Sequence, residues 1–383
     1  MIDHQKKYSV TIVQRLLPHY RISFFRLLTR INPDLEITVF HGDTTFRADS
    51  LPSFSSRFFR NYIFDLFGYT MTIQPTLMMK VLLARPDVLI IEGTFGVLTN
   101  FLLLVTRRIM RLPTLYWTAG WDNPKIAGWR LRLKSLFIRI SLRLCSGAIA
   151  YGSEALRYLT RHGLVRSDIV VAQNTIDIEA LISKHDDWAS QGALIRKKHE
   201  IEKDFVITYV GQLTAIKRVR VLLEAYDQLA ASRSDIALLI VGAGDAEEEL
   251  KQWAMSRRVP NVHFAGEVVN GVEAYFAAGD LFVLPGTGGL AINHAMALGL
   301  PIIATIADGT QRDLVLPGQN GYLVPVDDVS AMAEAINAAI SSPQQCKNLG
   351  KNSLKIIKEK ASLQNMAQQY SLAIRRELPR TTL

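Results

Sequence analysis

The chain has 383 residues, which favours two domains of ordinary size, and its 49% hydrophobic and 21% charged residues exclude wholesale disorder. Two cysteines, Cys145 and Cys346, are too few for a disulfide scaffold or a four-cysteine zinc site, and they suit a reducing compartment. The net charge of +9 is uneven, because residues 1–200 carry 27 Lys and Arg against 16 Asp and Glu. The first half therefore favours an anionic partner: a membrane surface, a nucleic acid or an anionic substrate. A solvated basic surface is the alternative.

Neither a secretory signal nor a membrane span is expected. Lys6 and Lys7 precede a short β-like run in place of a long apolar segment. The longest stretch without Asp, Glu, Lys or Arg, 281–307, contains prolines and glycines that are typical of loops and buried strands. These features predict a cytoplasmic protein.

Short apolar runs alternate with stretches of helical period along the whole chain. Strands are predicted at 8–13, 36–41, 87–92, 113–118, 148–152, 168–173, 204–211, 237–242, 262–266, 281–285, 301–306 and 321–325. Because most of these runs are continuously apolar, they indicate parallel strands that are buried on both faces. Strand–helix alternation in two blocks predicts an α/β protein with two doubly wound, Rossmann-like domains.

The domain boundary is predicted within 176–203, where the chain is polar and dense in charge. The first domain is then 1–185 and the second 200–361, with a last helical segment at 362–383 that no strand follows. Ligands of open α/β sheets bind beyond the carboxyl ends of the strands. Two such domains facing a cleft suit a transferase that holds one substrate on each domain.

Phosphate-binding chemistry is predicted where a strand ends at Gly211 and a helix begins near Lys217. Backbone amides at a helix start, together with a cation, suit a diphosphate. A solvated lysine at a helix start is the alternative. A second strand end opens the glycine-rich stretch 285–301, whose amides can approach an anion; His294 lies about two turns into the following helix, and a structural histidine is equally compatible.

A Gly-x-Gly turn at 242–244 follows another predicted strand, but the third glycine of a dinucleotide site is missing, so a tight structural turn is the better interpretation and a nicotinamide enzyme is disfavoured. No recognised RNA- or DNA-binding motif is present, so we expect no nucleic acid partner.

A set of motifs in fixed order resembles the retaining glycosyltransferases of family 4, which have the GT-B fold. The motifs are Gly211-x-Leu213, Lys217, Leu222-Leu223-x-Ala225, Val241-Gly-x-Gly244, Phe264-x-Gly266, Leu284-Pro285, His294-Ala-Met-Ala-x-Gly-x-Pro301 and Gly318-x-Asn-Gly321. The resemblance is strong over 204–345 and weaker over 1–175, where 16–21 and 151–153 are similar to the polysaccharide-assembly branch.

The resemblance implies a nucleotide-sugar donor on the second domain and a saccharide or lipid-linked acceptor on the first, in cell-envelope or exopolysaccharide assembly. It implies no metal and no cofactor, since the nucleotide-sugar is a substrate. The sequence agrees, because it contains neither an Asp-x-Asp triplet nor a paired-histidine motif. The last helix is expected to cross back to the first domain.

The resemblance also assigns donor-binding residues. They are Gly211, Gln212, Lys217, Arg218, Gly266, Glu267, Val268, Gly286, Thr287, Gly288, Gly289, Leu290 and His294. Lys217 is expected to hold the diphosphate, 286–290 to cradle phosphate and sugar, 266–268 to frame the base, and His294 to face the ribose. Three positions depart from the family pattern: Gly286 and His294 replace glutamates, Gln212 replaces an arginine with Arg218 as the substitute cation, and 116–122 lacks a histidine.

The implied reaction is transfer with retention, in which Lys217 and Arg218 stabilise the charge of the leaving diphosphate. The leaving phosphate can take the acceptor proton, and Asp122 is the side-chain candidate for a base or hydroxyl anchor. His19, Tyr20 and Arg21 follow the first strand and are candidates for acceptor binding. A purely structural role is the alternative for each.

The segment 129–144 predicts a helix with two apolar stripes and basic flanks. One stripe contains Trp129, Leu133, Leu136, Phe137, Ile140 and Leu144, and the other contains Leu131, Ile138 and Leu142. One stripe can pack on the sheet while the other meets anionic lipid, which predicts a peripheral position on the inner face of the plasma membrane. A buried helix with snorkelling arginines is the alternative.

Two other functions remain open. The replaced glutamates suit a catalytically silent protein that binds a nucleotide or sugar on the same fold. A nucleotide-sugar epimerase-like enzyme is the second alternative, and a gain of mass by an added acceptor would distinguish transfer from epimerisation.

Overall fold

The chain forms two compact units in a computed structural model that describes residues 7–44, 54–66, 69–120 and 128–379. The first unit contains Met1–Asn174 and Leu363–Leu383, and the second contains Thr175–Ser362. Each unit is a parallel sheet flanked by helices, so the predicted fold class is confirmed. The first unit ends at Asn174, before residue 185, because the following helix α6 (Ile178–Ile182) packs on α11 (Ala291–Ala297) of the second unit.

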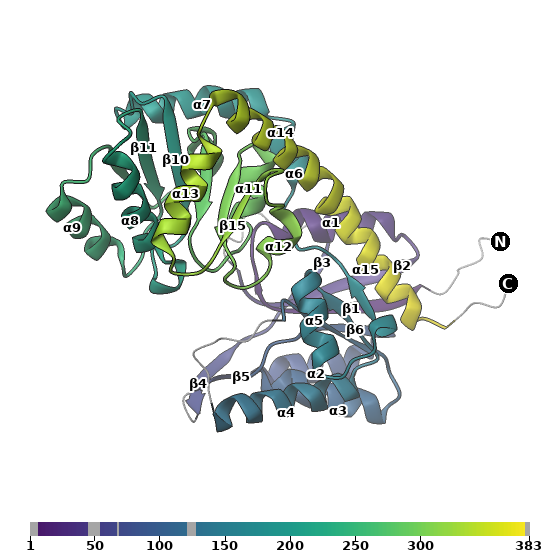
Figure 1. The fold of residues 1–383 in the computed structure, drawn as a ribbon. Coiled ribbons are helices and arrows are strands. Elements are labelled where there is room, and N and C mark those ends of the chain that lie inside the picture. Colours follow the sequence, from purple (N-terminus) through teal and green to yellow (C-terminus); the bar gives the residue numbers. More distant parts are fainter. Residues whose placement is uncertain (1–6, 45–53, 67–68, 121–127, 380–383) are drawn as a thin grey trace. The chain divides into compact units, whose positions relative to one another are not determined.

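The first unit contains a seven-stranded parallel sheet with the order β3-β2-β1-β6-β7-β8-β9 (Figure 1). Its strands are β1 (Tyr8–Leu17), β2 (Leu35–Thr44), β3 (Ser55–Phe58), β6 (Val88–Glu92), β7 (Thr114–Thr118), β8 (Gly147–Ala150) and β9 (Ile169–Val171). Its other elements are α1 (Arg21–Ile31), the antiparallel hairpin β4 (Tyr62–Leu66) and β5 (Tyr69–Ile73), α2 (Pro75–Ala84), α3 (Leu98–Ile109), α4 (Trp129–Leu144), α5 (Ser153–Arg161), the 3₁₀ turn η1 (Arg166–Asp168) and α15 (Leu363–Glu377).

Two apolar cores cover the two faces of this sheet. Helices α1 and α15 pack on one face, and α2 to α5 pack on the other. Strand residues alternate between the cores, with Trp117 in the first and Tyr116 in the second, as a two-sided parallel sheet requires.

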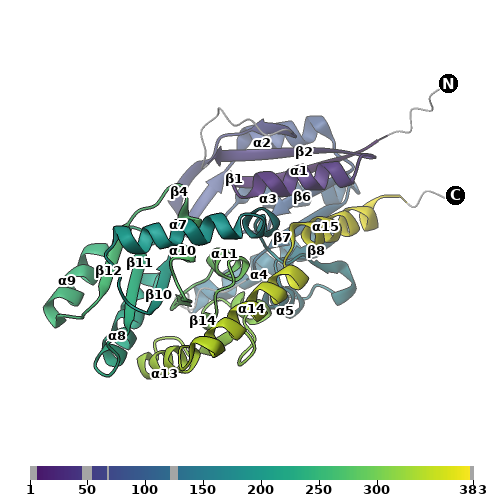
Figure 2. The same cartoon turned by 90° about the horizontal axis from the view of Figure 1, so that it is seen from above.

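Helix α15 completes the first core after the chain returns from the second unit. Its Tyr370 ring lies 4.8 Å from the Phe24 ring and 5.5 Å from the Trp117 ring, measured between centroids. Figure 2 shows α15 and α1 on the same side of the sheet, and the two helices are in contact. The predicted return of the last helix to the first domain is therefore present.

The second unit contains a six-stranded parallel sheet with the order β12-β11-β10-β13-β14-β15. Its strands are β10 (Phe205–Val210), β11 (Ile236–Val241), β12 (Val262–Gly266), β13 (Leu281–Leu284), β14 (Ile302–Thr305) and β15 (Gly321–Val324). Its helices, besides α6 and α11, are α7 (His185–Lys198), α8 (Val219–Ala230), α9 (Glu247–Arg257), α10 (Val272–Ala277), α12 (Gln311–Leu314), α13 (Val329–Ala339) and α14 (Pro343–Lys360), with the 3₁₀ turn η2 (Ala215–Lys217).

Strand order reverses between β10 and β13, which makes this pair the topological switch point of the second unit. Ligands of doubly wound sheets bind where two neighbouring loops diverge at such a point. The loops that follow β10 and β13 are therefore the first place to look for a site, and they contain Lys217 and the glycine-rich stretch.

Candidate functional site

Lys217 is held against the loop that follows β13. It stands at the end of η2, and its ammonium Nζ donates to the carbonyl oxygens of Thr287 at 2.9 Å and of Gly288 at 3.0 Å. Burial lowers the pKa of Lys217, and the negative charge of Asp308 opposes that shift. The predicted cation and the predicted loop are thus brought together at the switch point.

Gly286 allows the loop to lie directly on η2. A Cβ atom at this position would stand 2.4 Å from the carbonyl oxygen of Ile216 and 2.5 Å from the carbonyl carbon of Lys217. The amide of Thr287 donates to the same Ile216 oxygen at 3.1 Å. Where the family pattern has a glutamate, this chain therefore has no room for any side chain.

Asp308 binds the other side of this loop. One carboxylate oxygen accepts the amide of Gly288 at 2.8 Å, and the other accepts the amide of Thr310 at 3.2 Å and its hydroxyl at 2.8 Å. The sequence reasoning missed Asp308. The available signal was its place just after a predicted strand, since β14 neighbours β13 in the sheet.

Two of the five loop amides predicted to cradle an anion are therefore engaged inside the protein. The amide of Thr287 binds Ile216, and the amide of Gly288 binds Asp308. The cradle prediction is wrong for these two amides, because tertiary contacts with two neighbouring loops use them. Gly289 and Leu290 complete the loop before α11.

His294 and Arg218 have partners of their own. The His294 ring stacks on Phe276 at 5.4 Å between centroids, and its Nδ1 lies 3.2 Å from the carbonyl oxygen of Leu290. The Arg218 Nε donates to Asp327 at 2.7 Å, which directs this cation toward a carboxylate of its own unit. For phosphate binding, Lys217 thus remains the stronger of the two predicted cations.

The remaining predicted donor residues lie along the same edge of the sheet. Gly211 follows β10, and the backbone carbonyl of Gln212 accepts the Tyr209 hydroxyl at 2.8 Å. Gly266 ends β12 and is followed by an exposed Glu267 and a half-buried Val268. In the sheet, strands β11 and β10 separate β12 from β13, which the loop bound by Lys217 follows.

The Gly-x-Gly turn after β11 has a packing role. A Cβ atom on Gly244 would stand 2.2 Å from the carbonyl oxygen of Leu213, and the amide of Ala246 donates to that oxygen at 2.9 Å. The turn thus packs directly on the loop that precedes η2.

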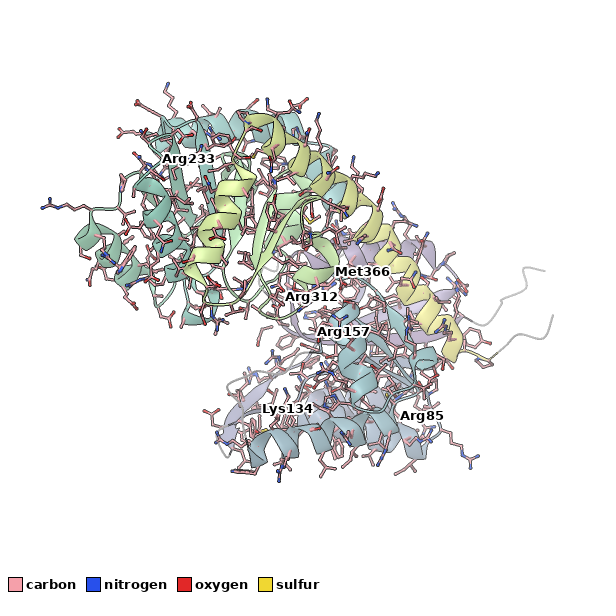
Figure 3. All side chains as sticks on the ribbon, in the orientation of Figure 1. Arg85, Lys134, Arg157, Arg233, Arg312 and Met366 are labelled. Atoms are coloured by element: carbon pink, nitrogen blue, oxygen red, sulfur yellow. The ribbon has the colours of Figure 1, made fainter. Side chains whose placement is uncertain are left out.

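The first unit contains a cavity of about 350 Å³ at the carboxyl ends of β6, β7 and β8. Helix α4 closes one side of it with Lys134 and Ile138, and Figure 3 labels Lys134 on that helix. Aromatic side chains, Tyr116 and Tyr151 among them, line much of the rest. Burial raises the pKa of both hydroxyls, so both stay protonated at neutral pH. The cavity suits a ligand that is partly apolar and carries hydroxyl or anionic groups.

Arg21 does not face this cavity, and its predicted acceptor role is not supported. Its side chain is 2% exposed, its guanidinium donates to Asn174 at 2.5 Å, and the guanidinium carbon lies 4.9 Å from the Trp117 ring centroid. The aromatic cluster around α15 encloses the cation. His19 and Tyr20, which precede α1, pack edge to face at 5.9 Å, and Asp122 lies outside the described residues.

Within the described ranges, no group of three or more His, Cys, Asp or Glu side chains is placed to hold a metal ion. No helix in the same ranges has the length and apolar character needed to cross a bilayer.

Comparisons with known proteins agree with this geometry. Residues 192–356 match the family described as "Glycosyl transferases group 1". The chain is 25% identical to the capsular polysaccharide biosynthesis glycosyltransferase CapM of Staphylococcus aureus over 284 residues, 71% of each chain. It is 35% identical to the phosphatidyl-myo-inositol mannosyltransferase of Mycobacterium leprae over 129 residues, 32% of this chain and 34% of that protein.

Among solved structures, Anabaena Alr3699/HepE in complex with UDP superposes with a TM-score of 0.77 at 19% identity. The match covers 96% of this chain and 100% of that chain. This likeness establishes the two-domain fold.

Proposed function

The chain is a glycosyltransferase with the GT-B fold, and from this premise we propose that it is a retaining, metal-independent enzyme. It transfers a sugar from a nucleotide-sugar to a saccharide or lipid-linked acceptor in cell-envelope or exopolysaccharide assembly. The proposal rests on one observation: at the switch point of the second unit, the Lys217 ammonium donates hydrogen bonds to the carbonyl oxygens of Thr287 and Gly288.

The donor diphosphate binds beside Lys217 in this proposal. The ammonium is half-buried and already held by two carbonyl oxygens, so little reorganisation is needed when negative charge develops next to it. The structures with UDP and with UDP-glucose among the fold relatives make uridine nucleotides the first donors to test.

The bond from the anomeric carbon to the diphosphate oxygen breaks, and the acceptor oxygen bonds to the same face of that carbon. The acceptor proton passes to an oxygen of the leaving phosphate, so no side-chain base is obligatory. Lys217 stabilises the charge left on the diphosphate. Asp122 remains the candidate anchor for the acceptor hydroxyl.

The cavity of the first unit is the proposed acceptor site. The curated relatives are named for a capsular polysaccharide and for a phosphatidyl-inositol acceptor, which supports a saccharide or a lipid-linked acceptor. Lys134 supplies a cation for an acceptor phosphate, and helix α4, on which it lies, is the proposed contact with an anionic membrane surface. A peripheral position on the inner face of the plasma membrane is part of this proposal.

A donor screen with EDTA present tests the proposal. One nucleoside diphosphate is expected to stabilise the folded chain by about 2.7 kcal/mol at a hundredfold excess over its Kd. The thermal midpoint is expected to rise accordingly. The matching nucleotide-sugar is then expected to glycosylate an added acceptor, and NMR of the product is expected to show the donor's anomeric configuration. A cooperative melt that no nucleotide shifts would favour the catalytically silent alternative, and a requirement for added metal would contradict metal independence.

A further inference from the structure

The first unit presents a surface that is both apolar and basic. We define the outer face as the hairpin β4–β5 together with the exposed sides of α2, α3 and α4. We propose that the outer face docks the first unit on an anionic lipid bilayer, with the apolar side of the hairpin placed in the boundary between headgroups and acyl chains. The proposal rests on the membrane contact of α4 proposed above and deepens it, because it assigns the hairpin as the inserting element.

Pairing in the hairpin separates an apolar side from a polar side. Phe64 pairs with Met71, and Tyr62 pairs with Ile73, and directly paired residues of antiparallel strands project to the same side. Leu66 and Tyr69 complete this apolar side. The other side holds Ile63 and Asp65 opposite Thr72 and Thr70, with the Thr70 hydroxyl donating to Asp65 at 3.0 Å.

Strand β4 is exposed along its whole described length, and its Tyr62 side chain is 50% exposed. An isolated two-stranded hairpin is marginal in water, and one that leaves an apolar side uncovered is an interaction surface or an aggregation hazard. Tyr69, Met71 and Ile73 of β5 are half-buried, so the part of the apolar side that needs a covering partner is Tyr62, Phe64 and Leu66 of β4.

The hairpin is joined to α4 by a chain of aromatic contacts. The Arg130 guanidinium carbon lies 5.5 Å from the Tyr69 ring centroid, and Tyr69 packs on Phe95 at 4.9 Å. Phe95 in turn packs on Phe137 of α4 at 5.3 Å. The hairpin and the N-terminal half of α4 thus form one continuous surface, and both lie on the lower edge of the first unit in Figure 1.

Helix α4 follows the two predicted stripes in part, because Leu131, which was predicted beside Ile138 and Leu142, is 37% exposed. Ile138 and Leu142 are buried against the sheet, whereas Trp129 is 62% exposed and Leu133, Leu136 and Ile140 are also exposed. Phe137 and Leu144, which were predicted in the exposed stripe, are half-buried and pack inward. The exposed stripe therefore contains fewer residues than predicted. The exposed residues include a tryptophan and branched aliphatic side chains, which suit a bilayer boundary.

Neighbouring helices extend the outer face. Helix α3 contacts α4, α2 and β5. It exposes Leu102 and Ile109, the following Met110 is exposed too, and α2 exposes Met79 and Leu83. Every element of the outer face therefore presents large apolar side chains to solvent.

The charge of the three helices of the outer face has one sign. Helices α2, α3 and α4 contain eight Lys and Arg residues and no Asp or Glu. Arg107 is buried and Lys134 lines the cavity, so six basic residues remain on the surface of these helices. Asp65, on the polar side of the hairpin, is the acidic residue of these elements, so six basic groups on the helices stand against one carboxylate. This excess of basic groups, interspersed with apolar ones, matches an anionic bilayer, which offers acyl chains beneath negative headgroups. A second copy of this chain fits poorly, because two such faces repel each other.

Vesicle flotation with paired variants tests the proposal. The wild-type chain is expected to float with vesicles that contain phosphatidylglycerol in phosphatidylcholine, and much less with phosphatidylcholine alone. Tyr62→Ser with Phe64→Ser is expected to lower the partition coefficient roughly tenfold without changing its salt dependence. Arg139→Gln with Arg143→Gln is expected to lower it roughly tenfold and to flatten the salt dependence.

Matched controls come from the second unit. Leu194→Ser with Met255→Ser removes two apolar side chains that are 65% and 74% exposed, and Lys347→Gln with Lys351→Gln removes two exposed charges. Both pairs are expected to bind vesicles like the wild type. Equal losses in the control pairs would overturn the assignment to the outer face.

A conservative variant keeps the test independent of folding. In the Phe64→Trp variant, lipids with brominated acyl chains are expected to quench a larger fraction of the tryptophan fluorescence than they quench in the wild-type chain. No added quenching in vesicles that bind the protein would overturn hairpin insertion. A concentration-dependent dimer that Tyr62→Ser with Phe64→Ser abolishes, without loss of vesicle binding, would assign the hairpin to self-association and overturn the proposal.

Donor binding separates this proposal from the proposed function. Nucleotide-induced thermal shifts are expected to be unchanged in every outer-face variant. Vesicle binding without any nucleotide binding would contradict the transferase alone, and nucleotide binding without vesicle binding would overturn the docking surface alone.

Discussion

Lys217 and Asp308 hold the two ends of a single peptide group. Lys217 donates to the carbonyl oxygen of Thr287 at 2.9 Å, and the amide of Gly288, which belongs to the same peptide, donates to Asp308 at 2.8 Å. A cation and an anion thus fix the orientation of the Thr287–Gly288 peptide. The loop that approaches the proposed donor is preorganised before any ligand arrives.

Replacement of Lys217 by methionine is expected to lower kcat/KM by about 100- to 1000-fold, the usual cost of removing one preorganised electrostatic donor. Steady-state kinetics with the donor identified by thermal shift measures this. Lys351→Met, an exposed change on α14, is the matched control and is expected to leave kcat/KM unchanged. Equal kinetics in the Lys217 variant would remove this residue from the donor site.

Asp308→Asn tests the other end of the peptide. The amide side chain retains one acceptor oxygen, but its NH₂ group accepts no hydrogen bond, so the variant cannot accept from Gly288 and Thr310 on two separate oxygens. The donor KM is expected to rise about tenfold while kcat changes less, since Asp308 acts through the loop. Asp308→Ala is expected to have a larger effect, and a fall in kcat alone would contradict this positioning role.

Gly286→Ala is expected to displace the loop. The added methyl group would meet the backbone of Ile216 and Lys217, which cannot move as a flexible side chain can. Overpacking of this kind costs about 1–3 kcal/mol. Calorimetry is expected to show a lower midpoint and weaker nucleotide binding. Thr287→Ala removes a methyl group and a hydroxyl that lies 3.4 Å from the Ile216 oxygen, and this neighbouring control should behave much like wild type.

Arg21→Ala is expected to destabilise the first unit by about 2–4 kcal/mol, because it empties a buried site and removes the donor to Asn174. Denaturant unfolding followed by the fluorescence of the adjacent Trp117 measures the change. Nucleotide-induced stabilisation of the second unit is expected to persist. A variant of normal stability with a raised acceptor KM would instead restore the acceptor-binding role.

Glu377 makes the stability of the first unit depend on pH. Burial raises the pKa of its carboxyl group, with a contribution from Asp168, while Ser146 and Arg376 oppose the shift. The folded state therefore holds the proton more tightly than the unfolded state, and stability is lost as pH rises through the interval between the ordinary pKa and the raised one.

Glu377→Gln removes this ionisation. The variant is expected to melt at a higher temperature than wild type at neutral pH, and the difference is expected to shrink as the pH falls below the ordinary pKa of a glutamate. Thermal melts over a pH series measure it. A difference that stays constant with pH would show that packing, and not ionisation, causes the effect.

Continuous apolar runs were sufficient to find most of the sheet. All twelve predicted strands are present, because most of them bury both faces and so carry a signal that needs no neighbour. Strands β3, β4 and β5 were missed. The hairpin β4–β5 exposes much of its apolar side, and β3 is a short edge strand with a polar sequence. Both patterns lack the core-facing period from which strands are recognised.

The site was found where it depends on strand ends and missed where it depends on loop contacts. Lys217 and the 286–290 loop follow neighbouring strands, so their meeting could be expected from topology. The hydrogen bond from the Gly288 amide to Asp308 is a tertiary contact between two loops. No local sequence pattern specifies that contact. Arg21 follows a strand end too, yet the return of α15 encloses it, and a contact across more than 300 residues leaves no local pattern.

The two crossings between the units lie side by side, since the Thr175 hydroxyl donates to the carbonyl oxygen of Ala361 at 2.5 Å. The second unit is therefore an insertion whose ends meet, while the first unit is interrupted by it. During synthesis the second unit is complete as soon as residue 362 leaves the ribosome, but the first unit still lacks the helix that carries Tyr370 into its core. The part of the chain that is made first is thus finished last, and loss of the final twenty residues would leave the second unit intact while opening the core of the first.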